Sequence, residues 1–279
     1  MPTVLLHVSD LHFGWPLLSH VAEAVEAAAA AIAPQAVVVS GDIVQRGDFS
    51  RLFLEAKKFL DRLPRPLLLV PGNHDLPFFN PFRRFFAPLE RFRQYISADP
   101  EPVLDVPGVR IVGVASPRSW AFDLGYVSRA QSSSVARALA AAPPGALRVV
   151  ALHHPILAQP GTGLRRHHLF ASRRLARELW AAGCDLVLSG HNHFPKACRL
   201  GPEVPGASDL VMAQAGTAAS RRFRPRSGWT VQSFNVVRAD ARFFEVGIHA
   251  WDEASRRFLP AATHRFERRP PSDAPVAVL

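Results

Sequence analysis

Short runs of aliphatic residues alternate with longer amphipathic stretches through the first two thirds of this 279-residue chain. The aliphatic runs predict buried strands because they are short and end at Gly, Pro or polar residues. The longer stretches have the apolar spacing of helices, and Ser19 is the expected N-cap of the first. The expected strands are 4–8, 36–39, 67–70, 110–114, 147–152 and 185–188, and the expected helices are 19–33, 49–63, 128–141 and 167–182. This alternation indicates an α/β layer with helices on the faces of a sheet.

The pattern changes after residue 195. Residues 210–213, 229–237 and 242–249 alternate like strands with one exposed face, and no long helix is evident between them. We expect these segments to form a second, mostly antiparallel sheet, so that the fold is a two-sheet sandwich flanked by helices. The expected domain is single and covers residues 1–267. A poorly ordered tail, rich in Pro, Arg and Ala, is expected over residues 268–279.

Composition narrows the class of protein. Hydrophobic residues make up 48% and charged residues 20% of the chain, which excludes a disordered protein and allows a real core. No apolar run approaches the roughly 18 to 20 residues of a transmembrane helix, and the N-terminus has no signal-peptide features. We therefore expect a cytoplasmic location. Cys184 and Cys198 lie outside any CxxC or Cys/His spacing and are expected to be free thiols.

The formal net charge of +10 comes mainly from arginine. A charge of this sign raises the expectation of an anionic partner, such as a nucleic acid, an anionic membrane or an anionic substrate. A composition rich in Arg, Ala and Pro is also what GC-rich coding produces. The charge alone therefore identifies no partner.

Polar residues with metal-ligand chemistry follow five of the predicted strands. They are Asp10-Leu11-His12, Gly41-Asp42, Gly72-Asn73-His74-Asp75, His153-His154-Pro155 and Gly190-His191-Asn192-His193. Carboxyl ends of strands are where α/β sheets place ligand sites, glycines permit tight turns, and alternate residues of an extended segment share a face. Each cluster alone is weak evidence, but burying so many Asp and His side chains without a cation would be costly. The set predicts two divalent cations, which suit carboxylate, imidazole and amide ligands.

The order D-x-H, G-D, G-N-H-D, H and G-H-x-H, over residues 4–250, resembles the calcineurin-like metallophosphoesterase superfamily. Within it, the chain is similar to single-domain bacterial members such as the class III cyclic nucleotide phosphodiesterases. The resemblance implies an α/β fold of four α-β-β-α layers, with two mixed sheets flanked by helices. It also implies a binuclear centre of Mn, Fe or Zn ions and a metal-dependent phosphoric diester hydrolase activity.

The resemblance also implies a role for each cluster residue. It assigns Asp10, His12 and His193 to one metal ion and Asn73, His153 and His191 to the other, with Asp42 bridging the two. A carboxylate suits the bridge because it has two oxygens. His153 is preferred to His154 because the family pattern is His-x-Pro, with the first His as the ligand. His154 then either points at the substrate or is an ordinary loop histidine.

Two further residues follow the expected ligand Asn73. The resemblance makes His74 the outer-sphere histidine, whose protonated form can stabilise charge on the phosphorus oxygens or protonate the leaving oxygen. Asp42 and His74 are thus the expected catalytic residues. Asp75 either orients His74 or caps the helix that follows.

Two metal ions about 3.5 to 4 Å apart lower the pKa of a bridging water, so that hydroxide is available near neutral pH to attack phosphorus in line. No side-chain nucleophile is required, and the sequence lacks G-x-S-x-G, a P-loop and a dinucleotide fingerprint. The expected reaction is hydrolysis of a small anionic phosphodiester. A 3',5'-cyclic nucleotide such as cAMP is the leading substrate, because the resemblance is to enzymes that cut these molecules.

Substrate choice is expected to depend on the loops around the metal ions. Arg46, in the loop 45–48, either holds a phosphate or pairs with a carboxylate, and Asn192 is expected to face the pocket. In the segment 76–96, seven aromatic residues alternate with arginines. This segment either packs an aromatic helix face on the core or forms a lid that stacks a nucleobase or contacts a membrane. Arginines in the segment 221–226 either contact an anion or are solvated.

Three other functions stay open. A pyrophosphatase acting on a UDP-2,3-diacylglucosamine-type lipid of lipid A synthesis would explain the Phe/Arg segment and the positive charge, and lipid vesicles would recruit it. A nuclease would bind nucleic acid with a steep salt dependence, although a nucleic-acid partner is not expected. An inactive metal-binding interaction module is disfavoured, because all seven ligands and His74 are present. A peripheral membrane contact stays open, and the sequence does not specify an oligomeric state.

Overall fold

Two six-stranded sheets form the centre of the molecule, which a computed structural model describes over residues 2–157, 169–223 and 228–269. The first sheet has the order β15-β14-β13-β1-β2-β3. Its strands are β1 (Thr3–Val8), β2 (Ala36–Ser40), β3 (Leu67–Val70), β13 (Ser233–Ala239), β14 (Phe243–Asp252) and β15 (Arg257–Glu267). The strands β1 to β3 pair in parallel, and the others are antiparallel. Every residue of β2 is buried, which is why its aliphatic sequence does not alternate with polar residues.

The second sheet has the order β11-β12-β10-β8-β5-β4, and its four central strands are parallel. Its strands are β4 (Val103–Val106), β5 (Val109–Val114), β8 (Leu147–Leu152), β10 (Leu186–Ser189), β11 (Lys196–Arg199) and β12 (Val211–Gln214). A small third sheet joins β6 (Pro117–Arg118), β7 (Ala121–Tyr126) and β9 (Leu169–Phe170). Parallel pairing brings the carboxyl ends of the central strands to one edge of each sheet.

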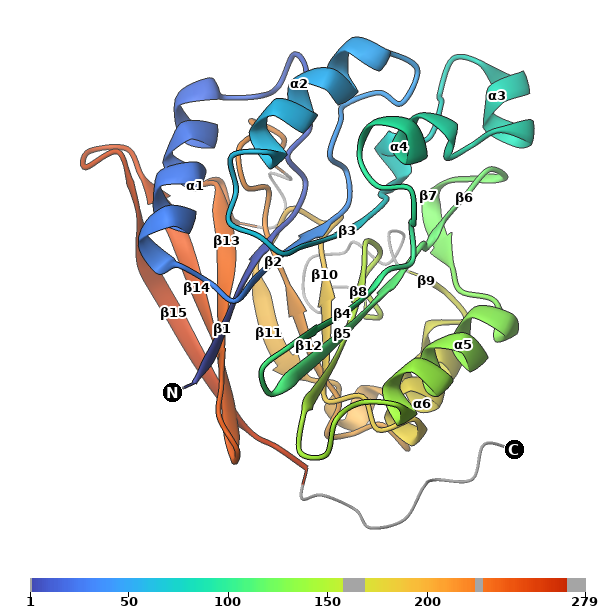
Figure 1. The fold of residues 1–279 in the computed structure, drawn as a ribbon, viewed down its shortest axis with the longest axis vertical. Coiled ribbons are helices and arrows are strands. Elements are labelled where there is room, and N and C mark those ends of the chain that lie inside the picture. The colour runs from blue at the N-terminus through green and yellow to red at the C-terminus, as the bar shows by residue number, and fades with distance from the viewer. Residues whose placement is uncertain (1, 158–168, 224–227, 270–279) are drawn as a thin grey trace.

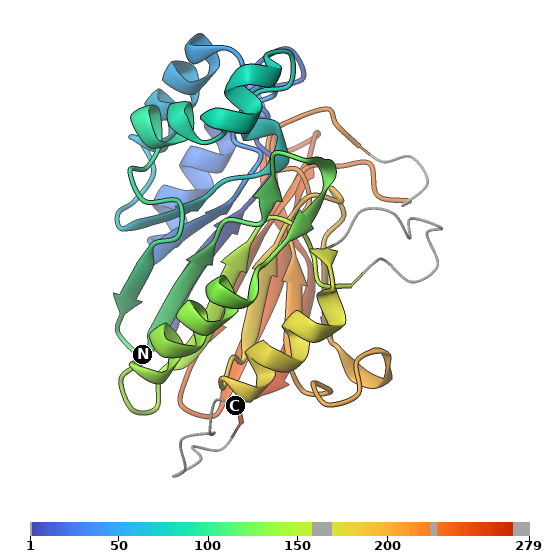
Figure 2. The same ribbon diagram turned by 90° about the vertical axis from the view of Figure 1, so that its right-hand side faces the viewer.

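Helices cover the outer face of each sheet, and the two inner faces pack on each other (Figures 1 and 2). The helices and turns are α1 (Ser19–Ile32), α2 (Ser50–Leu60), α3 (Pro81–Phe86), α4 (Glu90–Tyr95), α5 (Arg129–Ala140), α6 (Ser172–Ala181), η1 (Asn73–Asp75) and η2 (Gly201–Glu203). One core joins the first sheet to α1 and α2, and another joins the second sheet to α5 and α6. Between the sheets, Leu5 and Val38 share a third core with Val149 and Leu186. The predicted four-layer α-β-β-α sandwich is confirmed.

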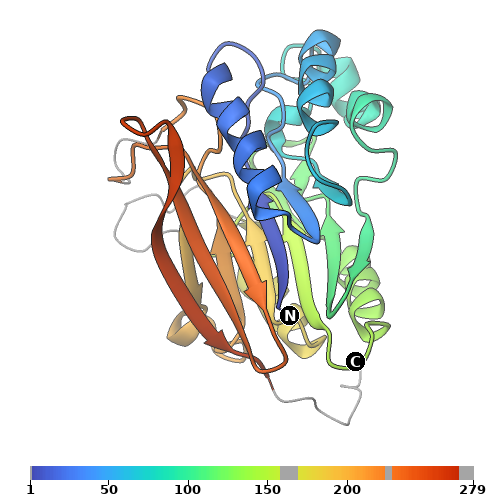
Figure 3. The same cartoon turned by 60° about the vertical axis from the view of Figure 1, so that its left-hand side comes forward.

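The antiparallel strands near the C-terminus do not form the second sheet, contrary to the expectation from the sequence. β13 pairs with β1, with Val237 opposite Leu5, so that β13 to β15 extend the first sheet beside α1 (Figure 3). β12 instead pairs in parallel with β10 in the second sheet, and all its residues are buried. Alternation predicts how a strand is buried, but its neighbour depends on contacts distant in sequence.

Two helix starts also differ from prediction. Leu18, not Ser19, is the N-cap of α1, because the Leu18 amide donates to Ala219 O at 2.8 Å and fixes the chain one residue earlier. The helix predicted over 167–182 begins only at Ser172, because the chain first pairs with β7 as the short strand β9. In both places a tertiary backbone contact outweighs the local pattern.

The remaining expectations concern the cysteines and the chain ends. Cys184 is buried, Cys198 is half-buried, and both are free thiols as predicted. No helix within the described ranges is long and apolar enough to span a bilayer. Most of the predicted tail, residues 224–226 of the segment 221–226, and residues 167–168 lie outside the described residues.

Candidate metal centre

The structure brings the five polar clusters together at one edge of the sandwich. They follow β1, β2 and β3 of the first sheet and β8 and β10 of the second, at the carboxyl end of each strand. Within the sheets, the Asp10 amide donates to Gly41 O at 3.0 Å, and the Gly190 amide donates to His153 O at 3.0 Å. Between the sheets, the His191 amide donates to Asp10 Oδ2 at 2.9 Å. Hydrogen bonds of the backbone and of side chains therefore both hold the five clusters in place at this edge.

Five of the seven predicted ligands have a left-handed backbone conformation. Their φ angles are 55° at Asp10, 52° at His12, 51° at Asp42, 71° at His191 and 54° at His193. Residues other than glycine adopt positive φ uncommonly, and Asp, Asn and His tolerate it best. Such conformations cost about 1–3 kcal/mol each and concentrate at functional sites. The donors thus lie on tight left-handed turns and not on the extended segments expected from the sequence.

Two glycines before the donors permit a close approach of the loops. Gly41 has a φ of 90°, as expected for a tight turn. Gly72 does not have a positive φ, but a Cβ atom there would overlap the backbone and the carboxylate of Asp42. The requirement at Gly72 is therefore space beside Asp42 and not conformational freedom.

The first donor set gathers four buried side chains around one point. Its members are Asp10, His12, Asp42 and His193. His193 Nε2 lies 3.0 Å from Asp10 Oδ1 and 3.1 Å from His12 Nε2. His12 Nε2 in turn lies 3.7 Å from Asp42 Oδ2. Two imidazole nitrogens and two carboxylate oxygens in this arrangement fit one divalent cation.

The second donor set uses the other oxygen of Asp42. Its histidines are His153 and His191, and Asn73 adds an amide oxygen. His153 Nε2 lies 3.4 Å from Asp42 Oδ1 and 3.1 Å from Asn73 Oδ1. His191 Nδ1 lies 3.0 Å from Asn73 Oδ1 and 3.2 Å from His153 Nε2. The carboxylate of Asp42 therefore lies between two donor sets, as a bridging ligand would.

Outer hydrogen bonds fix which nitrogen of two rings faces the centre. His153 Nδ1 donates to Ser40 O at 2.8 Å, and His193 Nδ1 donates to Arg222 O. Each bond leaves Nε2 to face the donor set, which is the arrangement that orients histidine ligands in metal sites. The donor chemistry and its support both fit divalent metal ions.

Charges within the buried cluster compensate each other. Burial raises the pKa of Asp42, but the neighbouring histidines, His153 first, outweigh it and hold the pKa well below its usual range. Burial lowers the pKa of His153, yet Asp42 and Asp10 raise it to about 9. The pKa of Asp10 is also lowered, because His193 outweighs burial. Both carboxylates are therefore ionised at neutral pH, as cation ligands must be.

His74 lies at the rim of the centre and lines a cavity of about 200 Å³. Its amide donates to Asp42 Oδ1 at 2.8 Å, and its ring Nδ1 donates to Gln45 O at 2.8 Å. Two guanidinium groups flank the ring: Arg222 Nη1 lies 3.0 Å from Nε2, and Arg46 Nη1 lies 2.9 Å from Nδ1. Burial and these two cations lower the pKa of His74, although Asp42 opposes them. These surroundings therefore favour the neutral ring over the protonated form considered from the sequence.

The walls of this cavity come from segments far apart in the chain. Phe78 comes from the segment before α3, and Phe122 comes from β7. The Arg46 guanidinium lies 4.9 Å from the centre of the Phe78 ring. Among the described residues, no carboxylate lies within ion-pair distance of Arg46, so the predicted alternative of a carboxylate partner is not what the structure has. Arg222 contacts a histidine 148 positions away, and no local pattern signals such a contact.

Two predicted substrate contacts do not line this cavity. His154 is buried, and its Nδ1 lies 2.9 Å from Ser116 Oγ. Asn192 is buried as well, and its Nδ2 lies 3.5 Å from Gln214 Oε1. The expectation that Asn192 faces the pocket, made because it lies between two ligand histidines, is not what the geometry shows. Asn192 lies between two residues with left-handed backbone, and its side chain is fully buried.

Asp75 has neither of its two expected roles. Its Oδ2 accepts from the Gly72 amide at 2.8 Å, and its Oδ1 accepts from the Val44 amide at 2.9 Å. It therefore caps its own short turn, η1, and ties that turn to the loop after β2. The helix that follows, α3, is capped by Asn80.

The segment 76–96 forms α3 and α4 and presents most of its aromatic side chains to solvent. The exposed fractions are 48% for Phe78, 63% for Phe79, 71% for Phe82, 56% for Phe85 and 75% for Phe86. Phe92 is fully buried, and Tyr95 stacks on Phe53. Packing of an aromatic helix face on the core, the alternative predicted first, is therefore right for Phe92 and Tyr95 and wrong for the five exposed phenylalanines.

Known proteins resemble this chain in sequence pattern and in fold. A family model described as calcineurin-like phosphoesterase matches residues 3–195. No curated protein sequence matches the chain significantly. The likeness in sequence is therefore to the family model.

Solved structures share the fold at low sequence identity. Purple acid phosphatase PPD1 from yellow lupin (Lupinus luteus) seeds has a TM-score of 0.69 and 11% identity, covering 96% of this chain and 54% of that one. PhoD has a TM-score of 0.68 and 8% identity, covering 96% and 70%. Vps29 from Chaetomium thermophilum has a TM-score of 0.51 and 11% identity, covering 96% and 100%. This chain spans about half the length of the lupin protein, and at these identities the likeness is one of fold.

Proposed function

Because the chain belongs to the calcineurin-like phosphoesterase family, we propose that it hydrolyses a phosphodiester with two divalent metal ions bound at the buried centre. The observation that carries the proposal is the shared carboxylate, since Asp42 presents one oxygen to each of two converging donor sets. When bound, the ions lower the pKa of a water molecule and offset the charge of the phosphate oxygens.

The seven expected ligands form two groups, one for each ion, and Asp42 belongs to both. Asp10, His12 and His193 would hold one ion, and Asn73, His153 and His191 would hold the other, with Asp42 shared between them. These ligand types suit Mn, Fe or Zn. Because Ser40 O and Arg222 O each fix a ligand histidine, the rings meet an ion without reorienting.

The substrate occupies the cavity beside His74 in this proposal. Arg46 and Arg222 supply guanidinium groups that recognise phosphate oxygens, and His74 lines the same cavity with its Nε2 3.0 Å from Arg222 Nη1. Phe78 and Phe122 offer ring faces on which a nucleobase stacks. The small cavity favours a compact diester over a nucleic-acid strand. A 3',5'-cyclic nucleotide is therefore the first candidate substrate.

A lipid-linked pyrophosphate diester, of the UDP-2,3-diacylglucosamine type, is the second candidate. It is favoured by one observation, the exposed phenylalanines of the segment 76–96 next to Phe78 at the cavity. Acyl chains would find apolar contacts there that a cyclic nucleotide does not need.

Removal of the metal ions is expected to abolish hydrolysis of bis(p-nitrophenyl) phosphate. Chelation followed by desalting should remove activity, and added Mn²⁺, Fe²⁺ or Zn²⁺ should restore it, with about two ions per chain by elemental analysis. The restored enzyme is then screened against cyclic nucleotides, linear diesters, nucleotide-sugar lipids and oligonucleotides. Full activity in a protein free of metal would contradict the proposal.

Replacing Arg222 with glutamine is expected to weaken hydrolysis without loss of metal. A hydrogen bond to a charged group contributes about 1.5–3 kcal/mol, so kcat/KM for the preferred diester should fall about 10- to 100-fold. Metal content should persist, because only the main-chain oxygen of Arg222 contacts His193. The matched control is Arg221→Gln, an exposed neighbour expected to behave like the wild type. Equal losses in the two variants would exclude a specific role for Arg222.

A further inference from the structure

A second surface lies beside the proposed catalytic cavity. It is built from large aromatic side chains that stand in solvent, and we call it the aromatic surface. Its members are Phe49, Phe78, Phe79, Phe82, Phe86 and Phe122. Single exposed apolar residues are common, but a contiguous apolar patch marks an interaction site.

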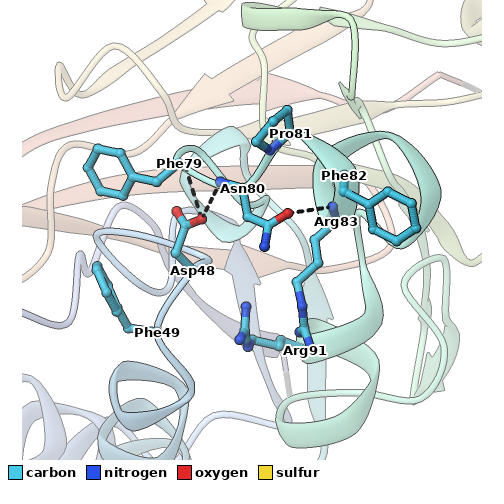
Figure 4. Close-up of a pocket in the computed structure, with 8 residues that line it drawn as sticks. All are labelled: Asp48, Phe49, Phe79, Asn80, Pro81, Phe82, Arg83 and Arg91. Atoms are coloured by element: carbon cyan, nitrogen blue, oxygen red, sulfur yellow. Dashed lines mark hydrogen bonds between the residues drawn. The ribbon is translucent and has the colours of Figure 1, made fainter.

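Ring contacts make the aromatic surface continuous. The ring centres of Phe49 and Phe79 are 6.3 Å apart, those of Phe79 and Phe78 are 5.2 Å apart, and those of Phe78 and Phe122 are 5.6 Å apart. Phe82 lines the same cavity of about 450 Å³ as Phe49 and Phe79 (Figure 4). Since Phe78 and Phe122 also line the cavity beside His74, the surface reaches the catalytic centre.

Polar contacts hold these rings outward. The carboxylate of Asp48 accepts hydrogen bonds from the amides of Phe78 at 2.7 Å, Phe79 at 3.0 Å and Asn80 at 3.1 Å. Asn80 Oδ1 accepts from the Arg83 amide at 2.8 Å and caps α3 (Figure 4). The loop that bears the phenylalanines is therefore fixed in a shape that exposes them.

A buried arginine joins the two parts of the surface. Arg84 donates to Pro77 O at 2.7 Å and to Ser119 O at 2.7 Å, so that it ties the start of α3 to the hairpin of β6 and β7. Its guanidinium carbon lies 4.0 Å from the centre of the Phe122 ring. Trp120, on the same hairpin, is also exposed and lies 6.2 Å from Phe170 by ring centres.

Positive charge predominates around the aromatic surface, since among the described residues its two cavities are lined by five arginines, Arg46, Arg83, Arg84, Arg91 and Arg222, and by two carboxylates, Asp48 and Asp123. The segment 76–96 contains four arginines and a single acidic residue, Glu90. Glu90 pairs with Arg83 at 3.2 Å, which leaves Arg91 and Arg93 without an acidic partner on this segment. A second copy of the chain on this face would set arginines against arginines. An anionic partner matches both the rings and the charge.

We propose that the aromatic surface docks the protein on an anionic lipid bilayer. Exposed phenylalanines flanked by arginines are the combination that inserts at the headgroup boundary and attracts anionic lipids. This proposal rests on the proposed function in one respect only. Docking would hold the cavity beside His74, where the proposed hydrolysis takes place, at the depth of lipid phosphates. Docking itself requires no turnover.

The test is sedimentation with vesicles of phosphatidylcholine, with or without a quarter of phosphatidylglycerol. The wild type is expected to sediment with the anionic vesicles, less so at high salt, and hardly at all with the neutral ones. Phe82→Ser/Phe86→Ser should bind more weakly by about tenfold for each phenylalanine. The matched control is Leu259→Ser. Leu259 is an exposed apolar residue on β15, which lies at the opposite edge of the first sheet from β3. This variant should bind like the wild type.

Hydrolysis of bis(p-nitrophenyl) phosphate and thermal melting are measured on the same proteins. Neither Phe82 nor Phe86 lines the cavity beside His74, so the rate of hydrolysis should match the wild type in all variants. Because both rings are exposed, the melting temperature should match as well. Absence of wild-type sedimentation with anionic vesicles would overturn the docking proposal, and so would an equal loss in Leu259→Ser. A wild type that dimerises through this face and ignores vesicles would assign the surface to a second copy. Vesicle binding without hydrolysis would overturn the proposed function alone.

Discussion

Replacing Asp42 with alanine is expected to remove both metal ions together and to abolish phosphodiester hydrolysis. One carboxylate oxygen belongs to each donor set, so a single truncation opens both. The loss in kcat should exceed the 10²–10³-fold typical of one deleted electrostatic group, because the entire charge of the centre changes. Elemental analysis and hydrolysis of bis(p-nitrophenyl) phosphate measure the two effects.

Two matched variants make the result specific. Asp61→Ala removes an exposed carboxylate at the C-terminal end of α2 and should leave metal content and activity unchanged. Asn73 belongs to the second donor set only, so Asn73→Ala should lose about one of the two ions. Loss of a single ion from Asp42→Ala, with Asn73→Ala losing the same amount, would exclude a bridging role for Asp42.

Replacing His74 with alanine is expected to lower turnover by about 10²–10⁴-fold while leaving the metal content nearly intact. Its ring belongs to neither donor set, and its contact with Asp42 is made by the main-chain amide, which the variant keeps. The ring also positions Arg222, whose Nη1 lies 3.0 Å from Nε2, so part of the loss should appear in KM. Steady-state kinetics on the metal-loaded variant separate the two terms.

The control for His74→Ala is His20→Ala, a histidine on α1 whose ring contacts Trp251 and belongs to neither donor set. It should keep wild-type kinetics. Parallel loss of metal and activity in His74→Ala would assign His74 to the metal centre itself and exclude the outer role.

The candidate ligands could be predicted because their signal is local. Each polar cluster follows a short aliphatic strand, and parallel strands end at the same edge, so the position of Asp10 or Asn73 along the chain nearly determines its place in the fold. The two-sheet architecture was also readable from the alternation of strands and helices. The identity of the sheet that receives β13 was not, because the pairing of Val237 with Leu5 joins opposite ends of the chain.

The sequence left open whether the segment 76–96 is core or surface, and which of its residues are exposed could not be predicted, because α3 reverses the usual link between hydrophobicity and burial. Arg84 is buried, since the carbonyl oxygens of Pro77 and Ser119 satisfy its guanidinium, whereas Phe82 and Phe86 remain exposed on the same short helix. Residue types along α3 would suggest the opposite. Arg84 is buried and the phenylalanines are exposed because the β6–β7 hairpin lies beside α3 and supplies Ser119 O to Arg84.

The left-handed turns of the metal centre have a consequence for how an ion is captured. Backbone bonds such as His12 N to Asp42 O at 2.9 Å hold the turns, and these bonds need no ion. The entropy of ordering the ligands is therefore lost when the chain folds and not when a cation arrives. An ion would therefore bind to donors that are already in position, and replacement of one metal by another would require only local desolvation and ligand exchange.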